Sequence, residues 1–467
     1  MTDTKWAPDL NQYPGPKYLG LSRALRDAVR NGDLTPNAQL PTVRDLAWRL
    51  HLTPGTVARA YQLATQEGLL AATVGRGTFV AAQSPRLGPT QALYTERVTG
   101  GMTGLVDLRP PQVPEVGQAE AFRAALLDMA EATGQGWLDY TSQSGEAALR
   151  AEIVTWVGDR VLGPIGPEDV ALTHGGQNAI HLILDCCLRG ERPAVLIEEL
   201  AYPGFRYAAR AARADVVAVE IDAMGIVPEA LEAACKRHAA QVLCLSTEAQ
   251  NPTTGRMPFE RRKAIADLAR RYDLHVLEDD CFSVGESDIP SLRALIPERT
   301  WLVGSMSKTV SAALRFGYVI CPTGLGEAGR LTAQHGFFAL SRPVADLMLH
   351  LFRSGAAAQI KARVQAEFSW RLQVLVSRLG GFDLSWQPGL PFVWLGLPLG
   401  WRASTFLRMA EARGVLLRSA DEYALVHARA PNAVRIAIAG QIPREAFVTA
   451  IDSLASLLAK PPSDLSA

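Results

Sequence analysis

Six short apolar runs alternate with helical stretches in the part of the chain that follows residue 100. The runs span 170–173, 194–197, 216–219, 242–245, 275–277 and 301–303. Strand-sized runs that alternate with helices are typical of a mostly parallel, doubly wound sheet. In such a sheet, binding sites lie at the carboxyl ends of the strands. The sequence therefore predicts an α/β domain whose functional residues closely follow these runs.

Residues with chemical functions follow five of the six runs. In chain order they are Gly176 and Gln177, Tyr202, Asn251, Asp279 and Lys308. Backbone amides at a glycine-rich helix start can bind phosphate, and a tyrosine ring can stack on a flat ligand. Taken singly, these residues also fit a tight connection, a turn or a helix cap. Because they occur together at strand ends, we expect one shared site.

Lys308 is the centre of the predicted site. Ser305 and Ser307 precede it at alternate positions behind the run 301–303, and Arg315 follows seven residues later. Burial disfavours the ammonium form of a lysine, so its neutral amine becomes available to condense with an aldehyde. The two hydroxyls and the guanidinium can hold a dianionic phosphate. These features predict pyridoxal 5'-phosphate, although a surface lysine in a polar loop would also fit Lys308 by itself.

The first 80 residues predict a different, smaller domain. A helical repeat ends at Asn31–Gly32, and a short helix covers 44–50. A third helix opens at Thr53–Pro54, where a capping residue precedes proline at the first helical position. Strand formers at 69–74 and 78–80 then flank a glycine-rich tip, as in a β-hairpin. Three helices and a hairpin form a winged helix-turn-helix.

Polar residues of this small domain are placed where duplex DNA would bind. Arg44 begins the second helix, Thr56 and Arg59 lie on the exposed face of the third helix, and Arg76 is at the tip of the hairpin. A recognition helix in the major groove and a wing over the phosphates would bring these side chains to DNA. Solvated helix charges are the alternative for each of them. The whole chain carries 47 basic and 47 acidic residues, which argues against coating of the entire protein by nucleic acid.

The small domain resembles the GntR-type DNA-binding domain. The resemblance rests on three segments, Leu40–Ala47 (LPTVRDLA), Thr53–Tyr61 (TPGTVARAY) and Gly75–Val80 (GRGTFV). Together these segments cover the helix-turn-helix and the wing. One departure is Pro54, which stands where the family usually has an arginine. One expected DNA contact is therefore missing.

The region from about Gly104 to Leu458 resembles the fold-type I aminotransferases, which have a large and a small subdomain. The resemblance implies a cofactor site made of Gly176, Gln177, Tyr202, Asn251, Asp279, Ser305, Ser307, Lys308 and Arg315. In that site Lys308 forms the internal aldimine, and Asn251 contacts the O3' oxygen of the ring. Asp279 pairs with the pyridine nitrogen, which keeps the ring an electron sink. Arg435 matches the arginine that binds the α-carboxylate of the substrate.

Two positions depart from the aminotransferase pattern. The family commonly has Asp-x-x-Tyr, and Phe282 stands here in place of the tyrosine whose hydroxyl bonds O3'. The asparagine segment reads Asn-Pro-Thr-Thr-Gly at 251–255, where Asn-Pro-Thr-Gly is usual. We therefore expect Asn251 to be the main side-chain donor to O3'.

The joining of the two domains resembles the MocR family of transcription regulators. The predicted division is a winged helix-turn-helix at 14–82, a linker at 83–103 and an aminotransferase-like domain at 104–460. The resemblance implies a homodimer that binds an operator in double-stranded DNA and senses an amine or amino acid by aldimine exchange at Lys308. The alternative is a pyridoxal phosphate-dependent aminotransferase with an accessory DNA-binding domain.

Composition excludes several other classes of protein. The start of the chain has no apolar run and the longest apolar stretches are strand-sized, so we expect no signal peptide, no membrane span and a cytoplasmic location. The six cysteines show no Cys-x-x-Cys spacing. They predict reduced core residues, with no disulfide framework and no metal site.

Overall fold

The structure is a computed structural model. It describes residues 6–66, 68–73, 77–81, 105–131, 138, 140–282, 285–425 and 428–460. The chain divides into two compact units, Met1–Ala92 and Leu93–Ala467. Arg76 and the linker predicted at 83–103 lie outside the described residues. The boundaries predicted at 14–82 and 104–460 stay predictions.

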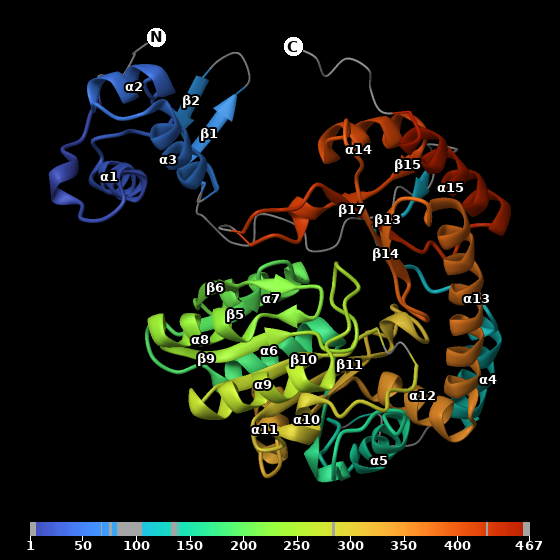
Figure 1. The fold of residues 1–467 in the computed structure, drawn as a ribbon. Coiled ribbons are helices and arrows are strands. Elements are labelled where there is room, and N and C mark those ends of the chain that lie inside the picture. The colour runs from blue at the N-terminus through green and yellow to red at the C-terminus, as the bar shows by residue number, and fades with distance from the viewer. Residues whose placement is uncertain are drawn as a thin grey trace. The chain divides into compact units, whose positions relative to one another are not determined.

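The first unit contains three helices and a two-stranded antiparallel hairpin (Figure 1). Its elements are η1 (Leu10–Gln12), α1 (Lys17–Asn31), α2 (Val43–Arg49), α3 (Pro54–Gln66), β1 (Leu70–Thr73) and β2 (Gly77–Val80). The Thr42 hydroxyl caps α2 by accepting a hydrogen bond from the N–H of Asp45 (3.2 Å). Thr53 caps α3 in the same way, through the N–H of Thr56 (3.3 Å). The predicted winged helix-turn-helix is confirmed.

One apolar core holds the first unit together. It contains buried side chains of all three helices and of the hairpin, including Leu21, Leu25, Leu46, Val57, Ala60, Tyr61, Leu70 and Val80. The hydroxyl of Tyr61 donates to the carbonyl oxygen of Pro41 (2.8 Å), so this buried phenol has a partner. The helical spacing of Leu21, Leu25 and Ala28 and that of Val57, Ala60 and Ala64 predict inward-facing stripes, and these side chains are buried.

A seven-stranded sheet is the centre of the second unit. Across the sheet the strands are β4 (Val170–Thr173), β12 (Gly317–Ile320), β11 (Thr300–Ser305), β10 (His275–Asp279), β9 (Ala240–Leu245), β5 (Ala194–Glu198) and β6 (Asp215–Val219). Only β12 is antiparallel to its neighbours. The six predicted strands are confirmed. The seventh, β12, was not predicted because it is short and directly follows the stretch that contains Lys308 and Arg315.

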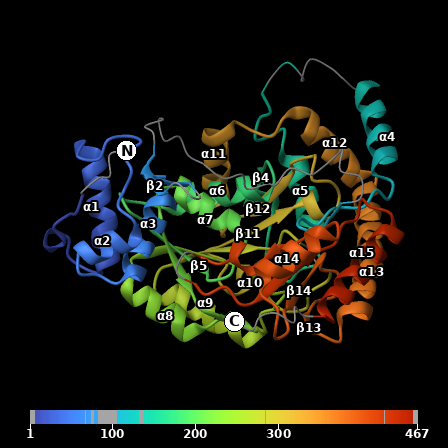
Figure 2. The ribbon, with the colours of Figure 1, turned by 90° about the horizontal axis from the view of Figure 1, so that it is seen from above.

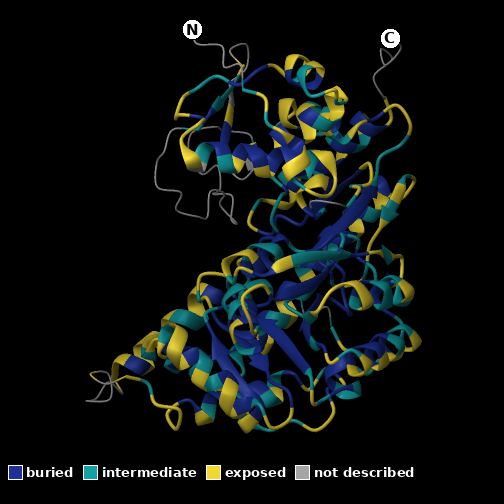
Figure 3. Cartoon of the chain, turned by 90° about the vertical axis from the view of Figure 1, so that its left-hand side faces the viewer, coloured by how far each residue is buried: buried dark blue, intermediate teal, exposed yellow. Residues whose placement is uncertain are grey.

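Helices cover both faces of this sheet (Figure 2). One face packs on α6 (Gly176–Cys187), α7 (Pro203–Ala211) and α11 (Gly326–Phe337), and the other on α8 (Pro228–Arg237), α9 (Phe259–Arg271) and α10 (Leu292–Leu295). Side chains alternate along each strand, so Val195 joins the first face and Leu196 the second. The inner strands are buried on both sides (Figure 3), as a doubly wound sheet requires, whereas the edge strand β6 is only partly buried.

A smaller antiparallel sheet forms the second part of this unit. Its order is β13 (Asp383–Ser385), β14 (Phe392–Gly396), β17 (Ala433–Ala437) and β16 (Arg418–Ser419), and α13 (Ala356–Leu379), α14 (Ala403–Ala412) and α15 (Arg444–Leu458) accompany it. Arg371 of α13 donates to the carbonyl oxygens of Ala439 (2.7 Å) and Ile442 (2.8 Å), which fixes the long helix to the end of β17. The predicted large and small subdomains are confirmed.

The remaining elements of the second unit lie outside these two sheets. They are β3 (Val106–Asp107), which pairs with β15 (Val415–Leu416), then α4 (Gln118–Glu131), α5 (Ala147–Trp156), η3 (Pro167–Asp169), β7 (Ile221–Asp222), β8 (Gly225–Ile226), η4 (Met306–Lys308), α12 (Arg342–Arg353) and η5 (Ala420–Glu422). Among the described residues, no helix has the length and apolar character that crossing a membrane would need.

Candidate cofactor and DNA-binding sites

The predicted site residues of the second unit lie where the sheet strands end. Asp279 and Ser305 are the last residues of β10 and β11, and Lys308 ends η4 directly beyond β11. Gly176 opens α6 after β4, and Tyr202 caps α7 after β5. Because these strands run in parallel, their ends meet at one edge of the sheet.

Hydrogen-bond donors for an anion gather around the start of α6. Gly175 has φ 81°, and a Cβ atom there would lie 2.8 Å from Nη2 of Arg315. That guanidinium also donates to the carbonyl oxygen of His174 (3.2 Å), so it is held beside the backbone amides that open α6. The hydroxyls of Ser305 and Ser307 lie 3.0 Å apart. These groups fit a phosphate.

Lys308 is held in a half-buried position by the chain before α4. Its Nζ atom donates to the carbonyl oxygen of Pro111 (3.0 Å). Burial lowers the pKa of Lys308 to about 8, and the positive charges of Arg435 and Arg315 add to this effect. About a tenth of the amine is therefore neutral and nucleophilic at pH 7, far more than for an ordinary lysine.

The carboxylate of Asp279 has one strong hydrogen bond and no cationic partner close to it among the described residues. Its Oδ1 accepts from the N–H of Cys281 (2.9 Å), and burial raises the pKa of Asp279. A protonated ring nitrogen beside this carboxylate would supply the missing charge. Cys281 was not predicted as a site residue. Its sulfur lies against Gly176, where an added Cβ atom would approach it to 2.6 Å.

Gly204 leaves the space that two predicted cofactor residues occupy. A Cβ atom at Gly204 would overlap the ring of Tyr202 and the side-chain oxygen of Gln177. Nε2 of Gln177 donates to the carbonyl oxygen of Gly204 (3.1 Å), and its Oε1 atom is buried without a partner. The side chain of Gln177 therefore braces the turn below Tyr202, whereas its backbone amide is the group suited to phosphate.

Arg435 reaches the same site from the small subdomain. It is 4 % exposed and donates to Oδ1 of Asn251 (2.8 Å) and to the carbonyl oxygen of Arg109 (2.8 Å). Its Nε atom is buried and has no acceptor. Burial lowers the pKa of Arg435 because no carboxylate of the described residues forms an ion pair with it. The arrangement suits a carboxylate ligand.

Phe282 belongs to an apolar cluster at the side of this site. Its ring packs edge-on against Phe392 at 5.0 Å between centroids, and the cluster also contains Ala249, Leu390 and Ala437. The position therefore offers no hydroxyl to a ligand. Asn251 remains the nearby side chain with an amide, and Arg435 binds the oxygen of that amide and not its nitrogen.

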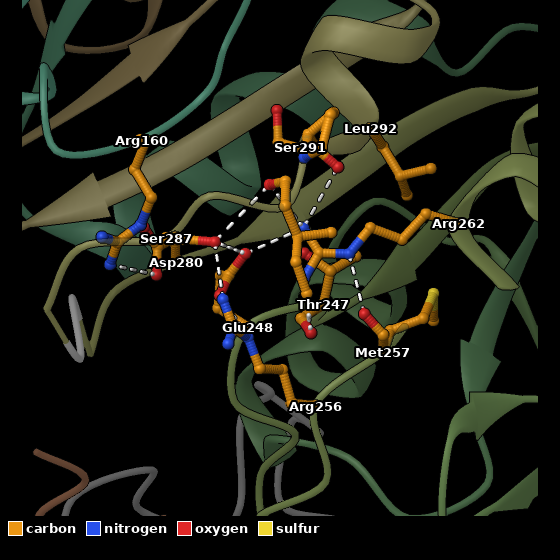
Figure 4. Close-up of polar contacts among 12 residues, drawn as sticks. Arg160, Thr247, Glu248, Arg256, Met257, Arg262, Asp280, Ser287, Ser291 and Leu292 are labelled. Carbon is orange, nitrogen blue, oxygen red and sulfur yellow. Dashed lines mark hydrogen bonds and ion pairs between the residues drawn. The ribbon is translucent and has the colours of Figure 1, made fainter. Parts of the chain in front are cut away.

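A second polar cluster lies at the ends of β9 and β10 (Figure 4). Glu248 forms ion pairs with Arg262 (2.8 Å) and Arg256 (3.1 Å) and accepts from the Ser287 hydroxyl (2.9 Å). Burial raises the pKa of Glu248, but Arg262 outweighs it, so the pKa ends below its usual value. This cluster is internally paired. The described residues contain no group of three potential metal-ligating histidine, cysteine or carboxylate side chains.

The predicted DNA-contacting residues are placed differently from one another. Arg44 is exposed on α2. The hydroxyl of Thr56 lies 2.9 Å from that of Thr53, and the guanidinium of Arg59 lies 4.0 Å above the ring of Tyr18. The cation–π contact was not foreseen, because it joins α3 to α1. Arg76 cannot be placed, since it is outside the described residues.

Comparisons with known proteins agree with both units. Residues 107–453 match the family "Aminotransferase class I and II", and residues 17–80 match "Bacterial regulatory proteins, gntR family". The chain is 28 % identical to the HTH-type transcriptional regulator YdeF of Bacillus subtilis, over 93 % of this chain and 92 % of that one. It is also 28 % identical to the HTH-type pyridoxine biosynthesis transcriptional regulator PdxR of Corynebacterium glutamicum, over 77 % and 78 % of the two chains.

A solved structure shows the same fold for the second unit. It is LysN, the alpha-aminoadipate aminotransferase of Thermus thermophilus, in complex with N-(5'-phosphopyridoxyl)-L-leucine. The TM-score is 0.65 at 25 % identity, over 76 % of this chain and 92 % of LysN. The chain belongs to the aminotransferase class I and II family and carries a gntR-type DNA-binding domain before it, which is the MocR-type arrangement of a transcription regulator.

Proposed function

We propose that the protein is a DNA-binding transcription regulator that uses pyridoxal 5'-phosphate to sense an amine or amino acid at Lys308. The observation that carries this proposal is that the half-buried Lys308 and the buried Arg435 converge on one site without a neutralising carboxylate among the described residues. A folded protein retains such charges where a ligand completes them. The gntR-type domain on the same chain provides the response.

The second unit holds the cofactor with residues from several strand ends. The amides of Gly176 and Gln177, the Ser305 and Ser307 hydroxyls and Arg315 bind the phosphate, Tyr202 stacks on the ring, Asn251 faces O3' and Asp279 faces the pyridine nitrogen. Bound there, the cofactor supplies an electrophilic carbon for amines and a ring that accepts electrons. Lys308 is the amine that an incoming effector displaces. Arg435 binds a carboxylate of the effector.

The regulator acts as a homodimer. Exposed apolar side chains on the second unit support this part of the proposal, since Tyr140 and Phe338 stack on each other at 5.4 Å and are 84 % and 67 % exposed. Leu138, which lies two residues before Tyr140 in the sequence, is also exposed. Grouped exposed apolar side chains are typical of a surface that another protein covers.

A working aminotransferase is the second candidate. The observation that favours it is that Lys308, Asp279 and Arg435 all reach the site, so the groups needed for binding and proton transfer are present. Phe282 weighs against it, because its ring packs on Phe392 and gives O3' no hydroxyl. We expect the effector to form a long-lived adduct, with little conversion to an oxo acid.

A spectral screen of the purified holoprotein tests the regulator function. Amino compounds are added singly, and the absorbance of the bound cofactor is recorded together with the anisotropy of a labelled operator duplex. We expect at least one amino compound to change both signals. Rapid repeated turnover with an oxo acid acceptor would contradict the regulator function and favour the aminotransferase. A spectral change that leaves DNA binding unaltered would also contradict the regulator function.

Arg44 tests the DNA-binding half of the proposal. An exposed arginine at the start of α2 is suited to a phosphate contact, which carries no sequence information. Arg44→Ala should therefore weaken binding to all duplexes about equally and lower the salt slope of binding by about one unit. Arg23→Ala, an exposed arginine on α1, is the control. An unchanged salt slope for Arg44→Ala would show that Arg44 does not contact a phosphate.

A further inference from the structure

One arginine of the helix-turn-helix lies against an aromatic ring. Cζ of Arg59, on α3, lies 4.0 Å from the centre of the ring of Tyr18, on α1. Tyr18 is partly buried and packs against the apolar core of the first unit, so its ring is held in place. A guanidinium that lies over an aromatic face needs none of its N–H donors for that contact. The ring therefore restricts the Arg59 side chain and leaves its donors available.

Arg59 lies on the exposed face of α3. Gly55, Arg59 and Gln62 are spaced by four and three residues, so they lie on one side of the helix, and all three are exposed. Gly55 has no side chain, and a Cβ atom added there would meet only the hydroxyl of Thr53 within 4 Å, at 3.9 Å. The edge of a base can therefore approach the helix closely one turn before Arg59.

The first two turns of α3 offer few other donors. Three exposed positions there have no polar side-chain group, namely Pro54, Gly55 and Ala58. The hydroxyl of Thr56 lies 2.9 Å from that of Thr53, so these two hydroxyls are partners. Arg59 has no hydrogen bond and no ion pair among the described residues. Arg59 is therefore the side chain of this region with donors left for a ligand.

We infer that Arg59 reads a guanine in the major groove and that Tyr18 is the positioning residue that holds its guanidinium for this contact. This inference rests on the proposed function, because it assumes that α3 enters the groove of an operator. The N-terminal part of a recognition helix contacts base edges, and an arginine binds O6 and N7 of guanine through two N–H donors. A long side chain that is restricted before binding loses less entropy when it binds.

Selection of DNA by the holoprotein tests the guanine contact. A pool of duplexes of random sequence is the probe, and Kd is then measured for a selected duplex and for a scrambled duplex of the same composition. We expect Arg59→Ala to weaken the selected duplex about tenfold, to weaken the scrambled duplex less than about threefold and to keep the salt slope nearly unchanged. An equal loss on both duplexes with a lower salt slope would make Arg59 a phosphate contact and overturn the inference. A selected sequence without guanine would overturn it as well.

Replacement of single guanines in the selected duplex identifies the atom that is read. 7-Deazaguanine keeps the base pair but lacks the N7 acceptor. We expect one replacement to raise Kd about threefold or more for the unaltered protein and to have no further effect on Arg59→Ala, because both changes remove the same contact. Replacements that act equally on the two proteins would show that Arg59 does not read a guanine.

Variants of Tyr18 test the positioning role. Tyr18→Leu should weaken the selected duplex about threefold and leave the scrambled duplex nearly unchanged, because an exposed cation–π contact contributes modestly. Tyr18→Phe keeps the ring face and should bind both duplexes like the unaltered protein. Tyr13→Leu, which removes another partly buried ring beside the same core, is the matched control and should retain the preference for the selected duplex.

Three results for Tyr18→Leu would contradict the positioning role. Tighter binding of the selected duplex would mean that the ring withholds Arg59 from DNA. Unchanged binding would mean that Arg59 needs no support from the ring. An equal loss on both duplexes would mean that Tyr18 only supports the fold.

The selection also separates this inference from the proposed function. If the holoprotein selects no duplex from the pool, the proposed function fails and this inference fails with it. If it selects a duplex whose binding does not depend on Arg59, only this inference fails.

Discussion

Two groups of charged side chains lie at the same edge of the large sheet and differ in how fully they are paired. Around Glu248, the buried Arg262 donates to the carbonyl oxygen of Met257 (2.9 Å) and forms an ion pair with Glu248 at 2.8 Å. Around Lys308, the buried Arg435 donates to neutral oxygens and lies 5.0 Å above the rings of Phe392 and Tyr423, and its Nε atom has no acceptor among the described residues. In both groups a buried arginine donates to backbone carbonyls. Among the described residues, only the arginine of the first group also has an acidic partner.

The pKa values express the same difference. Burial raises the pKa of Glu248, yet its arginine partners bring the pKa below the usual value. The pKa of Asp279 stays raised, because burial is not offset by a nearby cation. A completed cluster stabilises the fold, whereas an incomplete one is retained for a ligand. The contrast therefore distinguishes structural from functional polar groups without any reference to relatives.

The largest expected effect is at Lys308. Lys308→Ala should abolish covalent fixation of pyridoxal phosphate by borohydride, because the amine that we propose as the attachment point of the cofactor is lost. Lys263→Ala, an exposed lysine of α9, should be fixed as in the unaltered protein. Peptide mapping of the borohydride-reduced protein shows which lysine carries the cofactor. Label that persists in Lys308→Ala would place the reactive amine elsewhere.

The second largest expected effect is on stability, and it concerns the paired cluster around Glu248. Glu248→Gln should lower the free energy of unfolding by about 3–5 kcal/mol, because removing one partner leaves the Arg262 charge buried and uncompensated. Urea unfolding followed by circular dichroism measures this loss. The exposed Glu445→Gln on α15 is the control. A loss below about 1 kcal/mol would mean that water, rather than Glu248, balances the cluster.

Arg435 should behave in the opposite way. Arg435→Gln should change the free energy of unfolding little, or increase it, because the variant removes a buried charge that has no acidic partner among the described residues. Its affinity for an amino acid should fall about tenfold to a hundredfold, while that for the matching amine without a carboxylate stays nearly constant. Unfolding and spectral titration on the same sample test both parts. A large loss of stability would make Arg435 structural, like Arg262.

The smallest expected effect concerns pH. Only the neutral amine of Lys308 reacts with an aldehyde, and the pKa of Lys308 is about 8 in the protein without cofactor. The rate of cofactor uptake should therefore rise about tenfold per pH unit well below 8 and level off above it. Stopped-flow absorbance measures this rate. A midpoint near the ordinary lysine value would show that Lys308 is not dry.

Part of this structure could be predicted from local sequence patterns. The alternation of apolar runs predicted six strands, and the residues after those runs, from Gly176 to Lys308, do meet at one edge of the sheet. These positions could be predicted because parallel strands align their carboxyl ends whatever their order in the sheet. The helices and hairpin of the first unit followed from caps, glycines and periodicity in the same way.

The tertiary structure alone decided which groups complete the sites. The carbonyl oxygens of Arg109 and Pro111 hold Arg435 and Lys308, although no side-chain pattern marks a backbone acceptor. The contact of Arg59 with Tyr18 and the register that sets Arg418 opposite Arg435 join segments that are distant in sequence or on separate strands. Sequence determines which groups can donate or accept and on which element they lie. Long-range packing determines which partners they meet. At this sheet edge Asp279 and Arg435 have no oppositely charged partner among the described residues, and they are the groups suited to a ligand.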